Sequence, residues 1–177
     1  MRKRVVITGL GAISPLGLNV EDTWSALIAG KSGAAPITQF DASENKTTFA
    51  AEVKGFDANA VFGRRDARRM DRYVQFALAT SLQAVKDAGL VVTDENRDRI
   101  GVLIGTGIAG IGTLLKQAEV MAKRGPSRVS PFLVPMMLAD TGPGMVAIKL
   151  GVRGPNMSVV TACATGSNAL GEAAEII

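Results

Sequence analysis

The sequence of 177 residues has no histidine, a single cysteine and few aromatic residues, and each shortage excludes a class of site. Without histidine the chain lacks the usual general base and the commonest metal ligand. It cannot by itself form a Ser-His-Asp triad or a zinc site, and we expect no bound metal. One cysteine, Cys163, excludes an internal disulfide and favours a reducing compartment. The thiol of Cys163 is therefore the first candidate for chemistry.

Long uninterrupted apolar segments are also missing. The start of the chain, Met1–Arg4 followed by Val5–Leu18, superficially resembles a signal peptide. Glycines and Pro15 interrupt its apolar part, and no small-residue cleavage site follows, so we interpret it as a buried strand and turn. No run of about 18 apolar residues could span a membrane. We expect a cytoplasmic protein that does not bind membranes.

The residues that are abundant favour a layered α/β fold in one domain. Hydrophobic residues make up 47% of the chain and 20 residues are glycine, whereas aromatic residues make up 5%. This composition is typical of tight packing between helices and a mostly parallel sheet. The periodicity predicts strands at 4–8, 100–104 and 157–161, an edge segment at 47–53, and helices at 21–29, 71–88, 113–123, 136–150 and directly after Cys163.

The stretch Gly105–Gly110 matches the pattern G-x-G-x-x-G between a predicted strand and a predicted helix. That pattern suggests a dinucleotide-binding turn and hence a nucleotide-dependent oxidoreductase. This interpretation needs an acidic residue about 20 residues further on, where the chain has the basic loop Lys123–Pro126. We favour the alternative, a glycine turn that lets the backbone approach another backbone or a ligand closely.

Cys163 lies at a predicted strand-to-helix junction. Its neighbours Ala162, Ala164 and Thr165 are small, as a sharp turn that presents one side chain requires. A thiolate at a helix N-terminus is stabilised by the helix dipole, and backbone N–H groups there can hold a developing oxyanion. The alternative is that a lone cysteine is a small buried hydrophobic residue. The pattern alone leaves both interpretations open.

A cluster of arginines precedes the predicted helix 71–88. Arg65, Arg68, Arg69 and Arg72 would share one face if the segment were helical. A solvated face that aids solubility is one explanation, and a basic nucleic-acid-binding module, to which Arg64 would also belong, is another. The second lacks interleaved aromatic residues suited to base stacking, apart from Tyr73 and Phe76 downstream, so we expect no nucleic acid partner.

Further segments resemble the β-ketoacyl synthases, and they occur in the family's order over the whole chain. They are Val5–Gly11, Ser14–Gly17, Trp24, Gly30–Gly33, Arg69–Asp71, Ile104–Gly107, Ser130–Pro135, Gly151–Pro155 and Thr161–Cys163. The sequence is most similar to the elongating bacterial type, synthase II, with synthase I and polyketide-type ketosynthases as near relatives. Chain-length-factor paralogues lack the nucleophilic cysteine, so Cys163 argues against them.

The resemblance implies a thiolase-like fold of two similar halves, each with a mixed five-stranded sheet layered with helices. Residues 1–177 would be the first half, ending in the helix just after the nucleophile, with the C-terminal half absent. The chain stops at Ile176–Ile177 within an apolar helical pattern, which agrees with that expectation.

The implied activity is that of an acyltransferase and condensing enzyme in fatty acid biosynthesis. An acyl chain passes from acyl-carrier protein to Cys163, and malonyl-carrier protein then loses carbon dioxide and attacks it. No separate cofactor is implied, because the substrates are carried on the phosphopantetheine of acyl-carrier protein. The family uses two histidines and a lysine of the later half, so we expect residues 1–177 alone to be inactive.

The resemblance also assigns roles to residues outside the junction. Ile108 would gate the acyl pocket, and Leu133 and Val134 would line the pocket of the partner subunit in a homodimer. Arg65, Arg68, Arg69 and Arg128 would dock the acidic carrier protein. Many relatives have an aromatic residue at the position of Leu133 and a basic one at Ser127.

Overall fold

The computed structural model describes residues 4–177. They form two compact units. The larger unit comprises residues 4–7, 58–78 and 90–177, and the smaller unit comprises residues 8–57 and 79–89. No helix among the described residues is long and apolar enough to cross a membrane.

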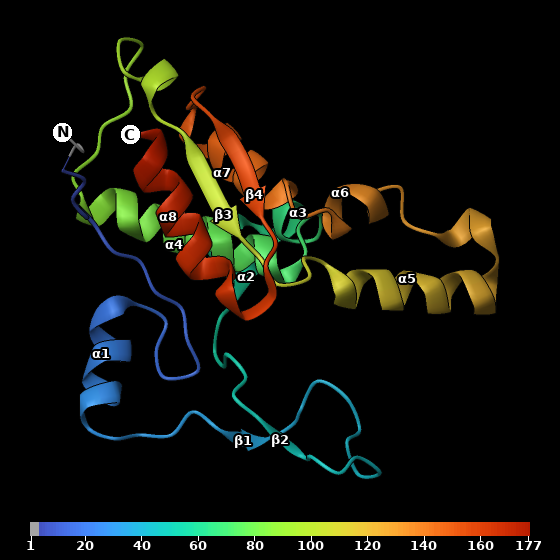
Figure 1. The fold of residues 1–177 in the computed structure, drawn as a ribbon. Coiled ribbons are helices and arrows are strands. Elements are labelled where there is room, and N and C mark those ends of the chain that lie inside the picture. Colours follow the sequence, from blue (N-terminus) through green and yellow to red (C-terminus); the bar gives the residue numbers. More distant parts are fainter. Residues whose placement is uncertain (1–3) are drawn as a thin grey trace. The chain divides into compact units, whose positions relative to one another are not determined.

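The larger unit carries most of the secondary structure (Figure 1). In chain order its elements are α2 (Ala58–Phe62), α3 (Arg64–Ala67), the first part of α4 (Arg72–Asp87), η1 (Arg97–Arg99), β3 (Val102–Gly105), α5 (Ile111–Arg124), η2 (Pro126–Arg128), α6 (Leu133–Met137), α7 (Thr141–Leu150), β4 (Asn156–Val159), η3 (Ala162–Ala164) and α8 (Thr165–Ile176). The helices predicted at 71–88 and 113–123 and the strands at 100–104 and 157–161 are confirmed, with bounds shifted by a few residues.

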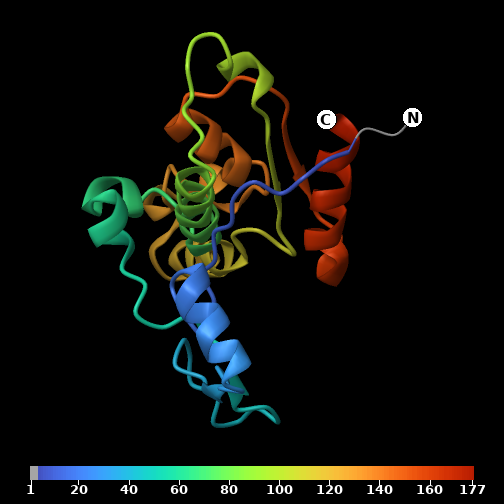
Figure 2. The ribbon, with the colours of Figure 1, turned by 90° about the vertical axis from the view of Figure 1, so that its left-hand side faces the viewer.

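Strands β3 and β4 form a parallel pair at the centre of this unit, with Val102 opposite Asn156 and Gly105 opposite Val159. Figure 2 shows the pair between two helices, with α7 on one side and α8 on the other. Val146 of α7 and Val102 of β3 are buried in this layer. The mixed α/β class predicted from composition is therefore confirmed, and both strands lead into turns at the same edge.

The single helix predicted at 136–150 is wrong, because two helices occupy this segment. Helix α6 ends at Met137, Leu138 adopts an extended backbone, and α7 begins after Asp140. Pro143 explains the interruption. Within a continuous helix its ring would clash with the carbonyl group of residue 139, whereas the first turn of α7 accepts a proline.

The smaller unit contains α1 (Val20–Ile28), the short antiparallel pair β1 (Ala35–Pro36) and β2 (Phe49–Ala50), and the last part of α4. Helix α1 confirms the prediction for 21–29. It begins at Asn19, whose side chain accepts a hydrogen bond from the Asp22 N–H (2.8 Å). The edge segment predicted at 47–53 is reduced to the two residues of β2.

The predicted strand 4–8 is wrong. Ile7 is 75% exposed, and the following residues lie along the last part of α4. There the Leu10 N–H donates to Asp87 Oδ2 (2.8 Å) and the Ala12 N–H donates to Gln83 Oε1 (3.0 Å). A Cβ on Gly11 would lie 2.0 Å from the Thr80 carbonyl oxygen, so glycine is required at that approach. Side chains of α4 thus satisfy backbone groups that a strand would pair.

The five-stranded sheet expected from the resemblance is not present in the part of the chain that the structure describes. Residues 4–177 form two sheets of two strands each, β1–β2 and β3–β4. The physical reason lies in the segment just described, which pairs with no strand here, and in the brevity of β1 and β2.

Candidate functional site

The carboxyl ends of β3 and β4 define one edge of the parallel pair. Thr106 follows β3, and its N–H donates to the carbonyl oxygen of Val159, the last residue of β4 (3.1 Å). The first residue of the turn after β3 is thereby joined to the last residue of β4. Ligands of parallel α/β sheets bind at this edge. The glycine turn and Cys163, both singled out from the sequence, lie in these two turns.

Cys163 is an exposed free thiol in the middle of η3. The single turn η3 intervenes between β4 and α8, so Cys163 stands two residues before the first residue of α8. Ala162, directly before it, has a φ of 49°, in the left-handed region that a residue with a Cβ rarely adopts. Such a conformation costs on the order of 1–3 kcal/mol and persists only where surrounding contacts hold it.

Thr165 supplies the contacts that close this turn. Its hydroxyl accepts a hydrogen bond from the Thr161 N–H (2.9 Å) and donates one to the Ala162 carbonyl oxygen (2.7 Å). Thr165 is 5% exposed and is the one buried polar residue among residues 4–177. Asn168 of α8 adds a bond to the Thr161 hydroxyl (2.9 Å). The turn that presents Cys163 is therefore fixed on both sides of the cysteine.

Gly105 at the end of β3 allows this arrangement. A Cβ on Gly105 would lie 2.3 Å from Cγ2 of Thr165 and 3.0 Å from its carbonyl oxygen. Any larger residue would push Thr165 and the start of α8 away from the sheet. The first glycine of the G-x-G-x-x-G pattern thus serves close packing against the cysteine turn, as the alternative interpretation of that pattern predicts.

Ile108 lies in the turn between β3 and α5 and is 70% exposed. The Thr106 hydroxyl accepts a hydrogen bond from the Ala109 N–H (2.9 Å), which closes the turn around Ile108. Gly110 ends it against α6, where its N–H donates to the Met137 carbonyl oxygen (3.3 Å). Helix α6 carries Leu133, half-buried, and Val134, exposed. The structure thus brings the turn of Ile108 against the helix of Leu133 and Val134.

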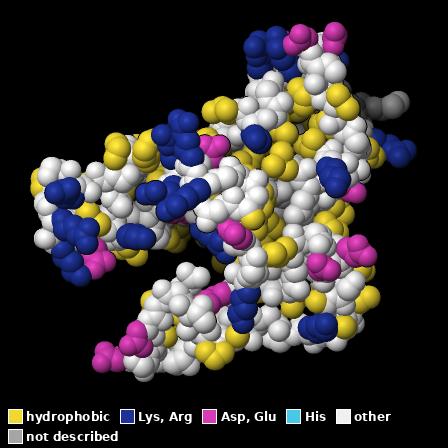
Figure 3. All heavy atoms as spheres, turned by 180° about the vertical axis from the view of Figure 1, so that it is seen from behind, with side chains coloured by type: hydrophobic (Ala, Val, Ile, Leu, Met, Phe, Trp, Pro, Cys, Tyr) yellow, Lys and Arg dark blue, Asp and Glu magenta, His cyan; other side chains and the backbone are white. Residues whose placement is uncertain are grey.

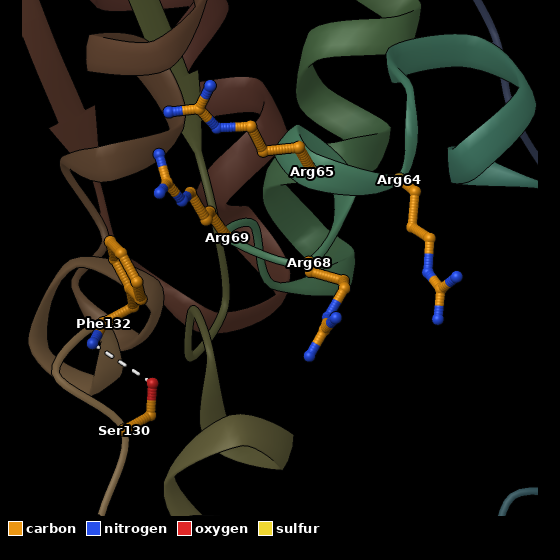
Figure 4. A pocket seen from close by; sticks show the side chains of 6 residues that line it. All are labelled: Arg64, Arg65, Arg68, Arg69, Ser130 and Phe132. Carbon is orange, nitrogen blue, oxygen red and sulfur yellow. Dashed lines mark hydrogen bonds between the residues drawn. The ribbon is translucent and has the colours of Figure 1, made fainter.

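The arginine cluster forms the wall of an open hollow of about 720 Å³. Figure 3 shows Lys and Arg side chains gathered over this face of the larger unit. The lining residues are Arg64, Arg65, Arg68, Arg69, Ser130 and Phe132. In Figure 4, Arg69 reaches over the Phe132 ring with Arg65 beside it, while Arg64 and Arg68 point away from the ring. The guanidinium carbon of Arg69 is 4.9 Å from the ring centroid, within cation–π range.

Two glutamines hold the walls of the hollow. The Gln75 side-chain amide of α4 donates to the carbonyl oxygens of Ala67 (3.0 Å) and Met70 (3.2 Å), which fixes the arginine turn. On the other wall the Ser130 N–H donates to Gln117 Oε1 of α5 (2.7 Å). Ala67 and Met70 are buried beneath the arginines. The exposed guanidinium groups are thus carried by a turn whose backbone is fixed by hydrogen bonds and by buried side chains.

The spacing suggested that the arginines share one helix, and this is wrong. Helix α3 ends at Ala67, and Arg68 and Arg69 follow in a turn. Arg72 begins α4 and lies over the Phe76 ring, 4.6 Å from its centroid. Arg128, the fourth predicted docking residue, lies in η2 and is not among the lining residues. Sequence reasoning missed Phe132 and Ser130 as lining residues, since only the fold brings them beside the arginines.

The chain is similar in sequence to proteins of known family. The sequence matches the family described as "Beta-ketoacyl synthase, N-terminal domain" over residues 2–177. It is 51% identical over 176 residues to the 3-oxoacyl-[acyl-carrier-protein] synthase 2 of Synechocystis sp. and 47% identical to that of Coxiella burnetii. Each alignment covers 99% of this chain and 42% of the relative.

A solved structure shares the fold. The ishigamide ketosynthase/chain length factor superimposes with a TM-score of 0.78 at 32% identity, over 99% of this chain and 45% of the other. The chain therefore spans less than half the length of the relatives and of the structure that it matches.

Proposed function

The chain belongs to the β-ketoacyl synthase family, in which it matches the N-terminal domain, and from this we propose that the full-length protein is a β-ketoacyl-[acyl-carrier-protein] synthase of type II. It would extend acyl chains in fatty acid elongation. The observation that carries the proposal is the exposed thiol of Cys163 on a strained turn at the carboxyl edge of two parallel strands. This is the geometry that a nucleophile between strand and helix requires.

Cys163 would be the catalytic nucleophile. Its sulfur attacks the carbonyl carbon of an acyl thioester on the carrier protein, and a new C–S bond forms as the carrier thiol leaves with the cysteine proton. Malonyl-carrier protein then loses carbon dioxide, and the resulting carbanion attacks the acyl group. The C–S bond to Cys163 breaks, and the thiol is restored by protonation. Backbone N–H groups near Cys163 would stabilise the oxyanion that forms in each step.

Residues 1–177 would be the first half of the protein and would be inactive alone. They contain no histidine to move the protons of the second step. Apolar side chains on both sides of the β3–β4 layer are exposed, among them Ile148 of α7 and Leu170 of α8. Such surface is typical of an interface, and the relatives are more than twice as long. The thiolase-like pairing of two five-stranded halves would be completed by that second part.

The arginine hollow would dock the carrier protein. Arg65, Arg68 and Arg69 present three cations at one open hollow, and the names of the relatives specify acyl-carrier protein as the carrier of the substrate. Carrier proteins of this type are acidic, so charge complementarity would steer their approach. Arg128 would contribute from η2, outside the lining of the hollow.

The acyl pocket would adjoin the cysteine turn. Ile108 is exposed in the turn joined to the end of β4, which makes it suited to gate access to Cys163. Leu133 and Val134 of α6 would line the pocket of a partner subunit. The homodimer and the cytoplasmic location stay predictions. A polyketide-type ketosynthase is the alternative function, because the solved structure at 32% identity is named as a ketosynthase/chain length factor and not as a synthase of fatty acids.

Acylation of Cys163 is the decisive test. The full-length protein is incubated with acyl-carrier protein bearing an acyl chain, and its intact mass is measured. We expect the mass of one acyl group to be added, on the peptide that contains Cys163, and C163A to add none and to lose elongation. Elongation by C163A at a near-normal rate would refute the proposal. Elongation only of polyketide intermediates would favour the alternative.

A further inference from the structure

Thr165 lies two residues after Cys163, and its side chain bonds to backbone groups of the two residues that precede the cysteine. The hydroxyl oxygen uses both of its capacities, accepting from the Thr161 N–H (2.9 Å) and donating to the Ala162 carbonyl oxygen (2.7 Å). The Thr165 N–H donates to the same Ala162 oxygen. One residue thus closes the turn before the cysteine by both backbone and side chain.

Ala162, which these hydrogen bonds hold, has an unfavourable backbone conformation. Ala162 has a φ of 49°, and nothing in an alanine side chain stabilises the left-handed region. If Ala162 relaxed to an ordinary φ, the peptide between Ala162 and Cys163 would rotate. The thiol and the Cys163 N–H would then point elsewhere. The direction of both groups therefore depends on the hydrogen bonds that Thr165 donates to Ala162.

The position of Thr165 is itself fixed. It is 5% exposed, and its methyl group faces Gly105, where a Cβ would lie 2.3 Å from Cγ2. The side chain of Thr165 therefore connects the cysteine turn to the end of β3. A movable surface hydroxyl could not impose a strained φ, whereas a buried one with both partners satisfied can.

We infer that Thr165 is a positioning residue for acyl transfer, whose hydroxyl holds Ala162 in the left-handed conformation and thereby aims the Cys163 thiol. The inference rests on the proposed function of Cys163. It concerns the hydroxyl in particular, because the methyl group serves packing against Gly105. The two parts of the side chain can be tested separately, since valine keeps the methyl group and serine keeps the hydroxyl.

The test compares T165V and T165S in the full-length protein. The readout is acylation of Cys163 by a small acyl thioester, followed by intact mass. For T165V we expect the rate constant for acylation to fall by about tenfold or more with KM nearly unchanged, because a misaimed nucleophile affects the reaction step and not binding. T165S should retain the rate within about threefold, since it preserves both hydrogen bonds of the hydroxyl.

A second substitution in T165V distinguishes positioning from general damage. Glycine adopts a positive φ without strain, so A162G introduced into T165V should recover part of the lost rate. If T165V alone does not fold, the double variant is compared directly with T165S. T113V removes a threonine hydroxyl from α5, where it bonds to Asp71, and serves as the control for loss of a hydroxyl elsewhere in the same unit. It should leave the rate of acylation unchanged.

The outcomes separate this inference from the function it rests on. Equal rates for T165V and the parent protein, or equal losses in T165V and T165S with no recovery by A162G, would overturn the role of the hydroxyl. Failure of the parent protein itself to become acylated at Cys163 would instead overturn the proposed function.

Discussion

The guanidinium group of Arg69 stacks over the ring of Phe132, 4.9 Å from its centroid, and joins the two walls of the arginine hollow. Phe132 directly precedes α6, the helix of Leu133 and Val134. Its N–H donates to the Ser130 hydroxyl (3.2 Å), which fixes the ring's approach. The proposed docking surface is thus in contact with the segment that leads into the proposed acyl pocket.

Replacement of Phe132 by leucine should weaken docking without abolishing it. Leucine retains an apolar side chain but removes the ring face that attracts the Arg69 guanidinium. Exposed cation–π pairs contribute about 0.5–1 kcal/mol to holding the arginine in place. Without the ring, docking has to order Arg69 at that cost, so the apparent KM for carrier-bound substrate should rise about two- to fivefold. Steady-state kinetics of the full-length protein give this value.

The pair Arg72 and Phe76 offers a matched control, because its geometry is similar (4.6 Å) and it does not line the hollow. F76L should leave the KM for carrier-bound substrate unchanged. A similar rise in both variants would show that loss of an aromatic ring, and not its place in the hollow, weakens binding.

Charge reversal of the hollow should act on the carrier and not on the chemistry. With R65E, R68E and R69E combined, we expect the KM for carrier-bound substrate to rise by about tenfold or more, because steering by charge is replaced with repulsion. Acylation by a small thioester, which has no acidic carrier, should stay nearly unchanged. In the parent protein, added salt should raise the KM for carrier-bound substrate by screening the same attraction.

Three exposed lysines of the smaller unit provide the control. K31E, K46E and K54E combined change the net charge equally but lie outside the hollow. That variant should bind the carrier almost as the parent protein does. An equal loss with carrier-bound and small substrates in the arginine variant would mean that the fold or the pocket was damaged, and docking at the hollow would be wrong.

Replacement of Gly105 by alanine should destabilise the protein and slow acylation of Cys163. The added Cβ would lie 2.3 Å from Thr165 Cγ2, and overpacking of this kind costs about 1–3 kcal/mol of unfolding free energy. Urea unfolding measures the loss. In G112A the new Cβ in α5 meets no atom within 4 Å, so that variant should be at least as stable as the parent. A fully stable G105A would contradict the packing of β3 against Thr165.

Most of the helices and the sharp turn at Cys163 could be predicted from local signals, because those signals act over a few residues. Asn19 before α1 and the apolar spacing of α4 specify helices wherever the rest of the chain lies. Small residues around Cys163 indicated a sharp turn, and the structure has one. The threonine that stabilises it carried no distinctive signal, since a threonine that begins a helix is common.

The failures concern long-range pairing. An apolar run such as 4–8 has the same pattern whether it pairs with strands or lies outside a sheet, and the hydrogen bonds of the next residues to α4 depend on Gln83 and Asp87, far along the chain. The break between α6 and α7 did have a local signal in Pro143, which the apolar periodicity obscured. The contact between Arg69 and Phe132 depends entirely on the fold.

Tyr73 of α4 connects the start of that helix to the segment between α6 and α7. Its hydroxyl donates to the Leu138 carbonyl oxygen, and its ring faces Gly142, where a Cβ would lie 3.2 Å from the ring. Burial raises the pKa of the Tyr73 phenol above its ordinary value near 10. The neutral, donating form of the phenol is therefore favoured in the folded protein.

Removal of this hydroxyl should reduce the sensitivity of the protein to alkaline pH. Below about pH 10 the phenol is protonated in both states and its contribution to stability is fully present. As pH rises further, the unfolded state loses the proton first, so stability falls until the folded protein ionises too. Y73F should lose about 1 kcal/mol at neutral pH, from the missing hydrogen bond, but decline less steeply above pH 10. Urea unfolding at a series of pH values measures both effects. Parallel alkaline slopes for Y73F and the parent protein would mean that Tyr73 keeps an ordinary pKa. Equal stability of the two proteins at neutral pH would mean that the bond to Leu138 does not constrain the segment between α6 and α7.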